Sequence, residues 1–456
     1  MSDANLSKPE ENSWVWSVLP INAGAQAFST MAPLYILHLG GTVLDVGLIA
    51  TLYNFILIPA SMFWGSMTDR LARRRFFFVV ASTGTMVVFL IMYLLPSIAA
   101  FAALFGLLAL VIGANSTASN LLVMETSEKK NWIAAYGRLS LFANIGATLG
   151  LAVGFVWSAV LPFDALLLFA SGSTAFSVAL SFFLVPEPEL TLESSQLALH
   201  PLGYVSRVYH GMTSAVQHLV LTTPSPKEVL RAFRATRAGA MTGRALLFIS
   251  TFFFTVGSAL LNTAFTPFLS EFGVTDSQVF ALSLVNATTQ TLAYRGVGGL
   301  IQRFGGVKAG SYSIILRAAF YILMAFTALA FRGFGLFVVG TLLFIVIGVA
   351  YAIWNASTSV MLFSSMGQDK QGNLLGGYAA LSNLGTVVGA FLTGYISYYD
   401  GYATTFAIAA GVLLVSFFVL EASLTRFGYA KRQGEEQGAR IEPTTGSGPI
   451  NSSSAP

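Results

Sequence analysis

The sequence contains no cysteine among its 456 residues, and only 10% of those residues are charged. The absence of cysteine excludes disulfide bonds and metal sites built from thiolates. The scarcity of charge excludes an ordinary soluble protein, since soluble domains carry about 25% charged residues. Hydrophobic residues make up 55% of the chain, and the mean hydropathy is +0.71. This composition indicates a protein whose solvent is lipid.

Long uncharged stretches recur along the chain, each near the roughly 20 apolar residues that cross a bilayer. We predict twelve transmembrane helices, at residues 14–40, 43–66, 76–95, 99–124, 132–160, 164–185, 244–270, 277–300, 308–331, 335–362, 372–398 and 402–424. The predicted fold class is an all-α membrane protein made of two six-helix bundles. The expected divisions are an N-terminal tail (1–13), a first bundle (14–185), a central loop (186–243), a second bundle (244–424) and a disordered tail (425–456).

Basic residues gather in alternate connections between these segments. Gly65–Arg75 holds one acid and four arginines between two apolar runs, and we predict a short loop there. Short loops rich in Lys and Arg stay in the cytoplasm. An even number of helices then puts both termini on the cytoplasmic side, and Arg332 is the basic residue that falls clearly outside. We expect a multi-pass protein of the cell (plasma) membrane.

The two halves of the sequence resemble each other. Residues 65–70 align with 298–303 at an offset of 233, and on the same offset Gly40 and Thr42 match Gly273 and Thr275. Later, residues 144–150 align with 383–389 at an offset of 239. Two parallel six-helix repeats are a transporter architecture in which substrate binds between the halves near the midplane.

The loop after the second helix carries a motif that resembles the major facilitator superfamily. In the family's Gly-x-x-x-Asp-Arg-x-Gly-Arg-Arg/Lys pattern, this chain has Gly65, Asp69, Arg70, Arg73 and Arg74, with Ala72 in the place of the second glycine. The second-half copy keeps Gly298 and Arg303 but has Gln302 in place of the acid. The resemblance covers residues 14–424 and implies a twelve-helix transporter that works by alternating access. The helix 5 Gly-Pro and the helix 4 arginine of proton-coupled drug exporters are both missing, so drug–proton antiport is not supported.

Two roles remain open for the charged motif. Asp69 could pair with an arginine such as Arg138 and latch the two halves together, or the motif could only fix the topology. Small residues at four-residue spacing suit close helix packing. We therefore expect helix contacts at Gly146, Gly150 and Gly154 with Asn144 beside them, and at Gly385 and Gly389 with Asn383 beside them.

Acids are missing from the middle of the predicted helices. All 20 lie in loops, tails or helix ends, and Arg138, Arg295 and Arg317 fall in the cytoplasmic thirds of their helices. Since ionisable residues deep in a bilayer mark ion pathways, no proton carrier stands out, and coupling to a proton or cation stays open. Amides and aromatics occupy the midplane instead. Our candidates for the substrate cavity are Gln26, Asn54, Asn115, Asn262, Asn286, Gln290, Trp354 and Asn355.

For each amide the alternative is a hydrogen bond between helices, worth about 0.6 kcal/mol in membranes. Neutral polar and aromatic groups favour a neutral or amphipathic solute.

The sequence of the central loop predicts two amphipathic helices, which either lie on anionic lipid headgroups or act as a plain linker. We expect no cofactor, no metal, no nucleic acid and a monomer. A membrane-embedded enzyme would need converging His, Asp, Glu or Cys residues, which the pattern does not offer. A transporter-like receptor that signals through the central loop is the open alternative.

Overall fold

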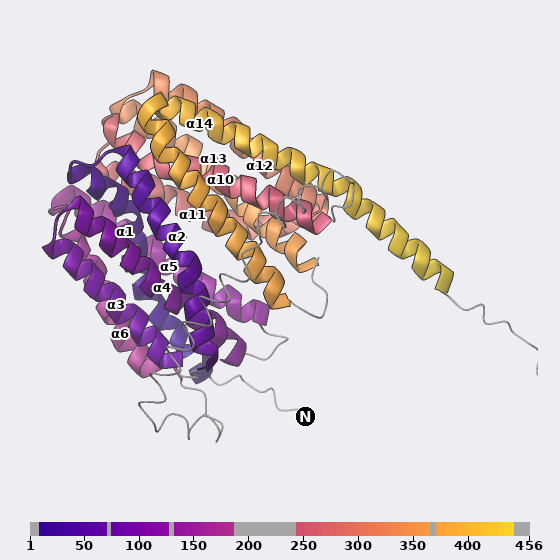
Figure 1. Ribbon diagram of the computed structural model, residues 1–456, viewed down its shortest axis with the longest axis horizontal. Coiled ribbons are helices and arrows are strands. Elements are labelled where there is room, and N and C mark those ends of the chain that lie inside the picture. The colour runs from indigo at the N-terminus through magenta and orange to yellow at the C-terminus, as the bar shows by residue number, and fades with distance from the viewer. Residues whose placement is uncertain (1–8, 71–73, 127–131, 187–242, 365–370, 442–456) are drawn as a thin grey trace, which may run out of the picture.

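The computed structural model describes residues 9–70, 74–126, 132–186, 243–364 and 371–441 (Figure 1). These residues are helical, and no strand occurs within them. The first half comprises a short 3-10 helix and six α-helices: η1 (Pro9–Ser17), α1 (Val18–His38), α2 (Val43–Arg70), α3 (Arg74–Leu94), α4 (Ile98–Thr126), α5 (Trp132–Val160) and α6 (Leu166–Leu184). The second half comprises α10 (Gly243–Glu271), α11 (Asp276–Phe304), α12 (Gly306–Ala330), α13 (Gly333–Ser364) and α14 (Gln371–Ile441).

The long helix α14 is two helices divided at Gly401. This residue has φ 83° and ψ 168°, a conformation that ends one helix before the next begins. Glycine adopts a positive φ without the steric cost that a Cβ would bring. Each half of the described chain therefore supplies six long helices, in agreement with the predicted fold class.

Nine segments of the described residues are long and apolar enough to cross a membrane. Residues 378–422 count as one of the nine, although they include both parts of α14. Helices α1 and α11, which carry several amide side chains, are not among them. Large apolar side chains such as Phe183 (79% exposed) and Leu329 (71% exposed) point out of the molecule along the helices. Exposed apolar surface on this scale is typical of a protein embedded in lipid.

The duplication in the sequence is also a duplication in local structure. Gly40 and Gly273, which are 233 residues apart, have φ values of 86° and 84°. After each glycine a threonine begins the next helix. Thr42 donates its N–H and its hydroxyl to Asp45, at 2.7 and 2.9 Å, and Thr275 forms a capping box with Gln278. The same turn therefore opens the second helix of each half.

Several helices extend beyond their predicted ends. We expected a loop at Gly65–Arg75, but α2 continues to Arg70 and α3 begins at Arg74. We expected the last helix to end at residue 424, yet α14 continues to Ile441. Residues 425–441 are rich in Ala, Lys, Arg, Gln and Glu, which are strong helix formers, and contain no proline. At the N-terminus, η1 begins inside the predicted tail, at Pro9.

The two halves meet near one end of the molecule, which we call the closed end. It is the end at which α1 passes to α2 and at which Gly401 divides α14. Helix α2 packs against α14, and α5 packs against α11. In Figure 1 the helices of the two halves lie together at this end and diverge toward the other, which we call the far end.

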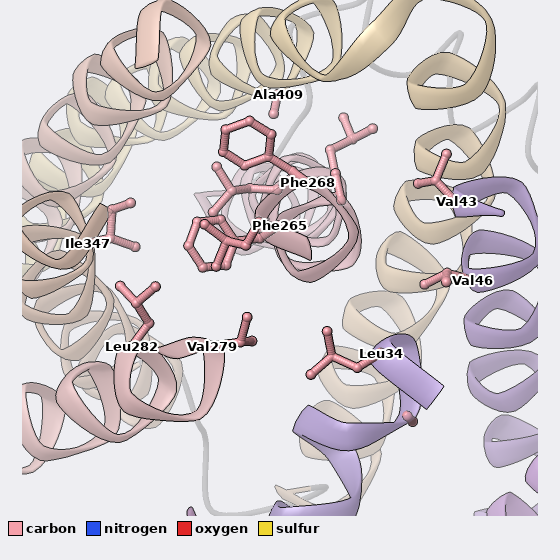
Figure 2. Packing of buried hydrophobic residues seen from close by; sticks show 14 of the residues in the cluster. Leu34, Val43, Val46, Phe265, Phe268, Val279, Leu282, Ile347 and Ala409 are labelled. Atoms are coloured by element: carbon pink, nitrogen blue, oxygen red, sulfur yellow. The ribbon is translucent and has the colours of Figure 1, made fainter. Parts of the chain in front are cut away.

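The buried core also joins the two halves toward the closed end. One large cluster contains residues of both halves; Figure 2 shows Leu34, Val43 and Val46 from the first half, and Phe265, Val279 and Leu282 from the second. A second cluster, which includes Trp14, Met67 and Phe78, lies toward the far end and contains first-half residues alone. Apolar packing therefore joins the halves at the closed end.

Candidate functional site

A cavity of about 400 Å³ lies against the first half of the molecule. Helices α1, α2 and α4 supply most of its wall, α3 supplies Phe89, and α10 of the second half supplies Asn262 and Thr263. The lining on α1 extends from Asn22 to Ile36. The fourteen helical steps between these two residues measure about 21 Å, so the cavity follows α1 through most of its length. Its position between the two halves makes it the candidate solute site.

The cavity wall combines amides with aromatic rings. Gln26, Asn54 and Asn262, three of the residues expected from the sequence, all line it. Asn54 donates its amide to the carbonyl oxygen of Ala50 at 2.8 Å, which fixes the orientation of its side chain at the wall. Asn22 makes the equivalent bond to Val18 at 2.7 Å.

Aromatic side chains cover the apolar part of the wall. The ring centroids of Phe28 and Phe89 are 4.7 Å apart, as are those of Tyr53 and Phe105. None of the described lining residues carries a formal charge. A cavity of this kind offers hydrogen bonds and apolar contact but no ion pair.

The remaining sequence candidates lie elsewhere. The amide nitrogen of Gln290 donates to Asn286 Oδ1, and Asn286 donates to the carbonyl oxygen of Phe344 at 3.0 Å, which ties α11 to α13. Asn355 is exposed and donates to the Tyr294 hydroxyl at 2.8 Å, again joining these two helices. These polar groups of the second half are engaged with each other in this conformation.

Trp354 and Asn115 complete the set of expected cavity residues. Trp354 is buried and stacks on Phe254, with ring centroids 4.1 Å apart. Asn115 is half-buried, and its Oδ1 has no hydrogen-bond partner within the described structure. Neither residue lines the cavity.

The sequence candidates did not include the phenylalanines of the cavity wall. Phe28, Phe89 and Phe105 line the cavity together with Ser29, but phenylalanine is frequent in every helix of a chain that contains 38 of them. Spacing along the sequence does not separate a phenylalanine that faces the cavity from one that faces lipid. The amides stand out in an apolar helix, and these rings do not.

The charged motif lies at the far end. Gly65, Asp69 and Arg70 fall in the last turns of α2, and Arg74 begins α3. Arg73 lies outside the described residues, as do the side chains of Asp69, Arg70 and Arg74. The expected partner Arg138 is exposed on α5. In the second copy, Gly298 faces open space, and the Arg303 guanidinium lies 5.6 Å from the Phe304 ring.

The glycine stripes lie where helices approach most closely. A Cβ at Gly146 or Gly150 would meet the α1 carbonyl oxygens of Leu19 or Ala23. At the corresponding places in the second half, a Cβ at Gly385 would meet Phe252 O at 2.8 Å, and one at Gly389 would meet Val256 O at 2.6 Å. The same helix pair thus packs through the same glycines in both halves.

Gly154 and Asn144, two other residues of the packing prediction, behave differently. Gly154 faces the Phe280 ring of α11, so it lies between the two halves rather than inside one. Asn144 is exposed and donates to Ser140 of its own helix at 2.9 Å, not to a neighbouring helix. Asn383 is half-buried on α14.

Polar contacts also join the halves at the closed end. His38 Nε2 of α1 lies 3.2 Å from Asp276 Oδ2 of α11, with 44% and 22% of these side chains exposed. Burial raises the pKa of Asp276, and the charge of His38 acts in the opposite direction. Ser277 donates to the carbonyl oxygen of Phe155 at 3.1 Å. A Cβ at Gly47 would lie 2.5 Å from the Gly394 Cα, so α2 and α14 are in backbone contact.

Comparison with known proteins agrees with this geometry. A sequence model described as the Major Facilitator Superfamily matches residues 16–242 and 247–446. The multidrug resistance protein MdtG of Salmonella paratyphi C is 23% identical over 404 residues, which cover 86% of this chain and 90% of that protein. MdtG of Salmonella typhi shows the same identity and coverage.

Solved structures of transporters have the same fold. The nucleoside transporter NupG superposes with a TM-score of 0.68 at 14% identity, over 91% of this chain and 99% of that one. The human organic anion transporter MFSD10 superposes with a TM-score of 0.57 at 18% identity, over 91% of this chain and all of that one. At these identities the likeness concerns the fold alone.

Proposed function

This chain belongs to the Major Facilitator Superfamily, whose members are transporters rather than enzymes, and we propose that it moves a small neutral or amphipathic solute by alternating access. The moving bodies are the first bundle (14–185) and the second bundle (244–424), with residues 186–243 as their connection. The two bundles rock about the central cavity and expose it to each side of the membrane in turn.

The observation that carries this proposal is that the contacts between the halves gather at one end of the molecule. The His38–Asp276 and Gly47–Gly394 contacts lie toward the closed end, and the first-half residues of the shared apolar cluster lie in the closed-end halves of their helices. The cavity begins beside these contacts, at Ile36 and Val46, and extends along α1 to Asn22, toward the end at which the helices of the two halves diverge (Figure 1). This is the arrangement that alternating access requires of one of its two states.

The side of the membrane follows from the basic residues. The far end carries Arg70, Arg74, Arg138 and Arg303, and short connections rich in Arg and Lys stay in the cytoplasm. We infer that the far end and both termini are cytoplasmic and that the protein resides in the plasma membrane. The conformation described here is then closed toward the outside and faces inward.

The uncharged cavity wall supports the choice of solute. Amides and aromatic rings bind neutral polar groups and apolar bodies, whereas a strongly charged solute would lose its hydration in this cavity without an ion pair in return. The similarity to multidrug resistance proteins supports drug-like amphipaths as the first solutes to test. The coupling ion and the direction of transport are separate questions for the same assay.

The test is solute uptake by purified full-length protein in liposomes. A panel of sugars, nucleosides, amino acids and amphipathic drugs is assayed with and without a pH gradient. We expect saturable uptake for at least one solute. Gln26→Ala should raise its KM by roughly 2- to 12-fold, the loss of one neutral hydrogen bond of about 0.5–1.5 kcal/mol.

The matched control is Asn144→Ala, because the Asn144 side chain is exposed and bonds to its own helix. This variant should keep the wild-type KM. Binding of solutes with no flux under any gradient would overturn the transport proposal. It would favour a transporter-like receptor that signals through residues 186–243.

A further inference from the structure

The interior of the second half holds a buried arginine, Arg317. It lies near the middle of α12, eleven residues after Gly306 and thirteen before Ala330, rather than in the cytoplasmic third expected from the sequence. Its side chain is 2% exposed. The guanidinium Nε donates to the Tyr321 hydroxyl at 2.6 Å, while Nη1 is buried and has no hydrogen-bond partner among the residues that the structure describes.

The charge of Arg317 has no acidic partner among the described residues. The acids of the second half whose side chains are described lie at the membrane ends of their helices: Glu271, Asp276, Asp400 and Glu421. Glu271 accepts from Tyr402, and Asp276 pairs with His38. An arginine remains protonated in proteins, and a buried charge without a partner is strongly unfavourable. Charged residues inside a membrane bundle are retained mainly where they serve function.

Aromatic rings surround the guanidinium. Its Cζ atom lies 5.2 Å from the ring centroids of Phe254 on α10 and Tyr351 on α13, and 5.4 Å from that of Tyr321. Phe254 in turn stacks on Trp354. Cation–π contacts replace part of the lost hydration, but they do not satisfy the N–H groups of Nη1. The aromatic rings therefore stabilise the guanidinium cation, and the N–H groups of Nη1 remain available to donate to an anion.

We propose that Arg317 binds the single carboxylate or sulfonate of an amphipathic substrate, with Phe254 and Trp354 packing against its aromatic or apolar body. This inference rests on the proposed transport function and narrows its substrate class to amphipathic monoanions. One guanidinium neutralises one negative charge, so a dianion would leave a net buried charge. The site lies within the second half, whereas the cavity wall on the first half is uncharged.

Helix α10 connects this site to the cavity. Asn262 lines the cavity, and Phe254 lies eight residues earlier on the same helix, about 12 Å along its axis. The substrate's apolar body enters from the cavity. Arg317 is enclosed in the conformation described here, so the anionic group reaches it only if α10 and α13, which lie in the same bundle, also move apart locally.

The test uses full-length protein in nanodiscs of phosphatidylcholine and matched pairs of probes. Indole-3-acetate is compared with indole-3-acetamide, and 4-phenylbutyrate with 4-phenylbutyramide, by isothermal titration calorimetry. Each pair shares its apolar body and differs in charge. Wild-type protein should bind each acid at least about tenfold more tightly than its amide, a difference of about 1.4 kcal/mol.

Arg317→Met should remove the preference for acids, so that the variant binds each acid and its amide with equal affinity. Because it deletes an unpaired buried charge, the unliganded variant should melt at the wild-type temperature or above. The matched control Arg295→Met replaces an exposed arginine on α11 and should keep the preference. If Arg317→Met fails to fold, Arg317→Lys serves instead. Lysine keeps the charge but loses the planar fork, so it should weaken acid binding at least threefold.

Equal binding of acid and amide by wild type would overturn the inference, as would an acid preference that survives in Arg317→Met or an unchanged acid affinity in Arg317→Lys. A variant that melts lower but keeps the preference would show a purely structural arginine. Uptake of the same probes into liposomes separates the two proposals. Saturable amide uptake without acid preference leaves transport standing, whereas Arg317-dependent acid binding without flux leaves only the anion site.

Discussion

A single methyl group at Gly47 should shift the protein away from the conformation described here. A Cβ on Gly47 would lie 2.5 Å from Gly394 Cα and 3.0 Å from the carbonyl oxygen of Ala390. Nonbonded carbon atoms prefer about 3.5–4.0 Å, so α2 and α14 must separate by about 1 Å. Overpacking of this kind costs about 1–3 kcal/mol. We therefore expect Gly47→Ala to change the ratio of closed to opened molecules by roughly 5- to 150-fold.

The substitution should leave the fold itself intact. Alanine gains about 0.8–1.0 kcal/mol over glycine in a helix interior, so the penalty falls on the contact between the halves and not on α2. Gly172→Ala and Gly411→Ala are the controls, because a Cβ at either position meets nothing within 4 Å. Both should behave as wild type.

Spin labels at the closed end can measure this shift. Leu95→Cys and Phe334→Cys place labels on one exposed residue of each half, 53% and 69% exposed, and the chain has no native cysteine to remove. Double electron–electron resonance in nanodiscs should show a longer distance population in Gly47→Ala and not in the controls. An unchanged distance distribution would refute the reasoning that this contact limits closure.

Two further predictions concern the same architecture. The closed state should lose population as pH rises through the raised pKa of Asp276, because burial of this carboxyl in the closed state favours its protonated form. Asp276→Asn should flatten the pH dependence of the same label distance. Separately, Gly150→Val forces a side chain against Ala23 O and should lower stability by about 1–3 kcal/mol, measured by thermal unfolding against Gly411→Val.

The helix order and the duplication were predictable because both depend on the local sequence alone. Hydropathy depends on composition within a window, and a span needs nothing from its neighbours to be recognised. The repeat was visible because glycines such as Gly40 and Gly273 hold backbone positions that other residues fill poorly. The close approach of α5 to α1 at Gly150, and of α14 to α10 at Gly389, involves the small-residue stripes found in the sequence.

The partners of polar side chains were not predictable in the same way. Asn286, Gln290 and Asn355 looked like Gln26 and Asn54 in the sequence. Asn286 and Asn355 nevertheless bond to a neighbouring helix and Gln290 bonds to Asn286, whereas Gln26 and Asn54 line the cavity. Which face of a helix meets the cavity depends on how the bundle is rotated, and one amide in an apolar helix does not reveal it. The burial of Arg317 was missed for a related reason. Its depth depends on where α12 begins, and its enclosure depends on rings from α10 and α13.

Helix ends at the membrane surface were also hard to place. Hydropathy marks where an apolar span stops, but a helix continues into water wherever the residues favour it. The extension of α2 to Arg70 and of α14 to Ile441 follows this rule. The charged motif around Asp69 therefore begins on a helix rather than in a loop.

The most direct test of alternating access is a reversible cross-link across the closed end. His38 and Asp276 approach within 3.2 Å from opposite halves, and His38→Cys with Asp276→Cys provides two thiols in a chain that otherwise has none. Liposomes are treated with a short bifunctional thiol reagent that a reductant cleaves, and uptake of a transported solute is measured. The account predicts that cross-linking stops most of the uptake and that the reductant restores it. Undiminished uptake by fully cross-linked protein would contradict it.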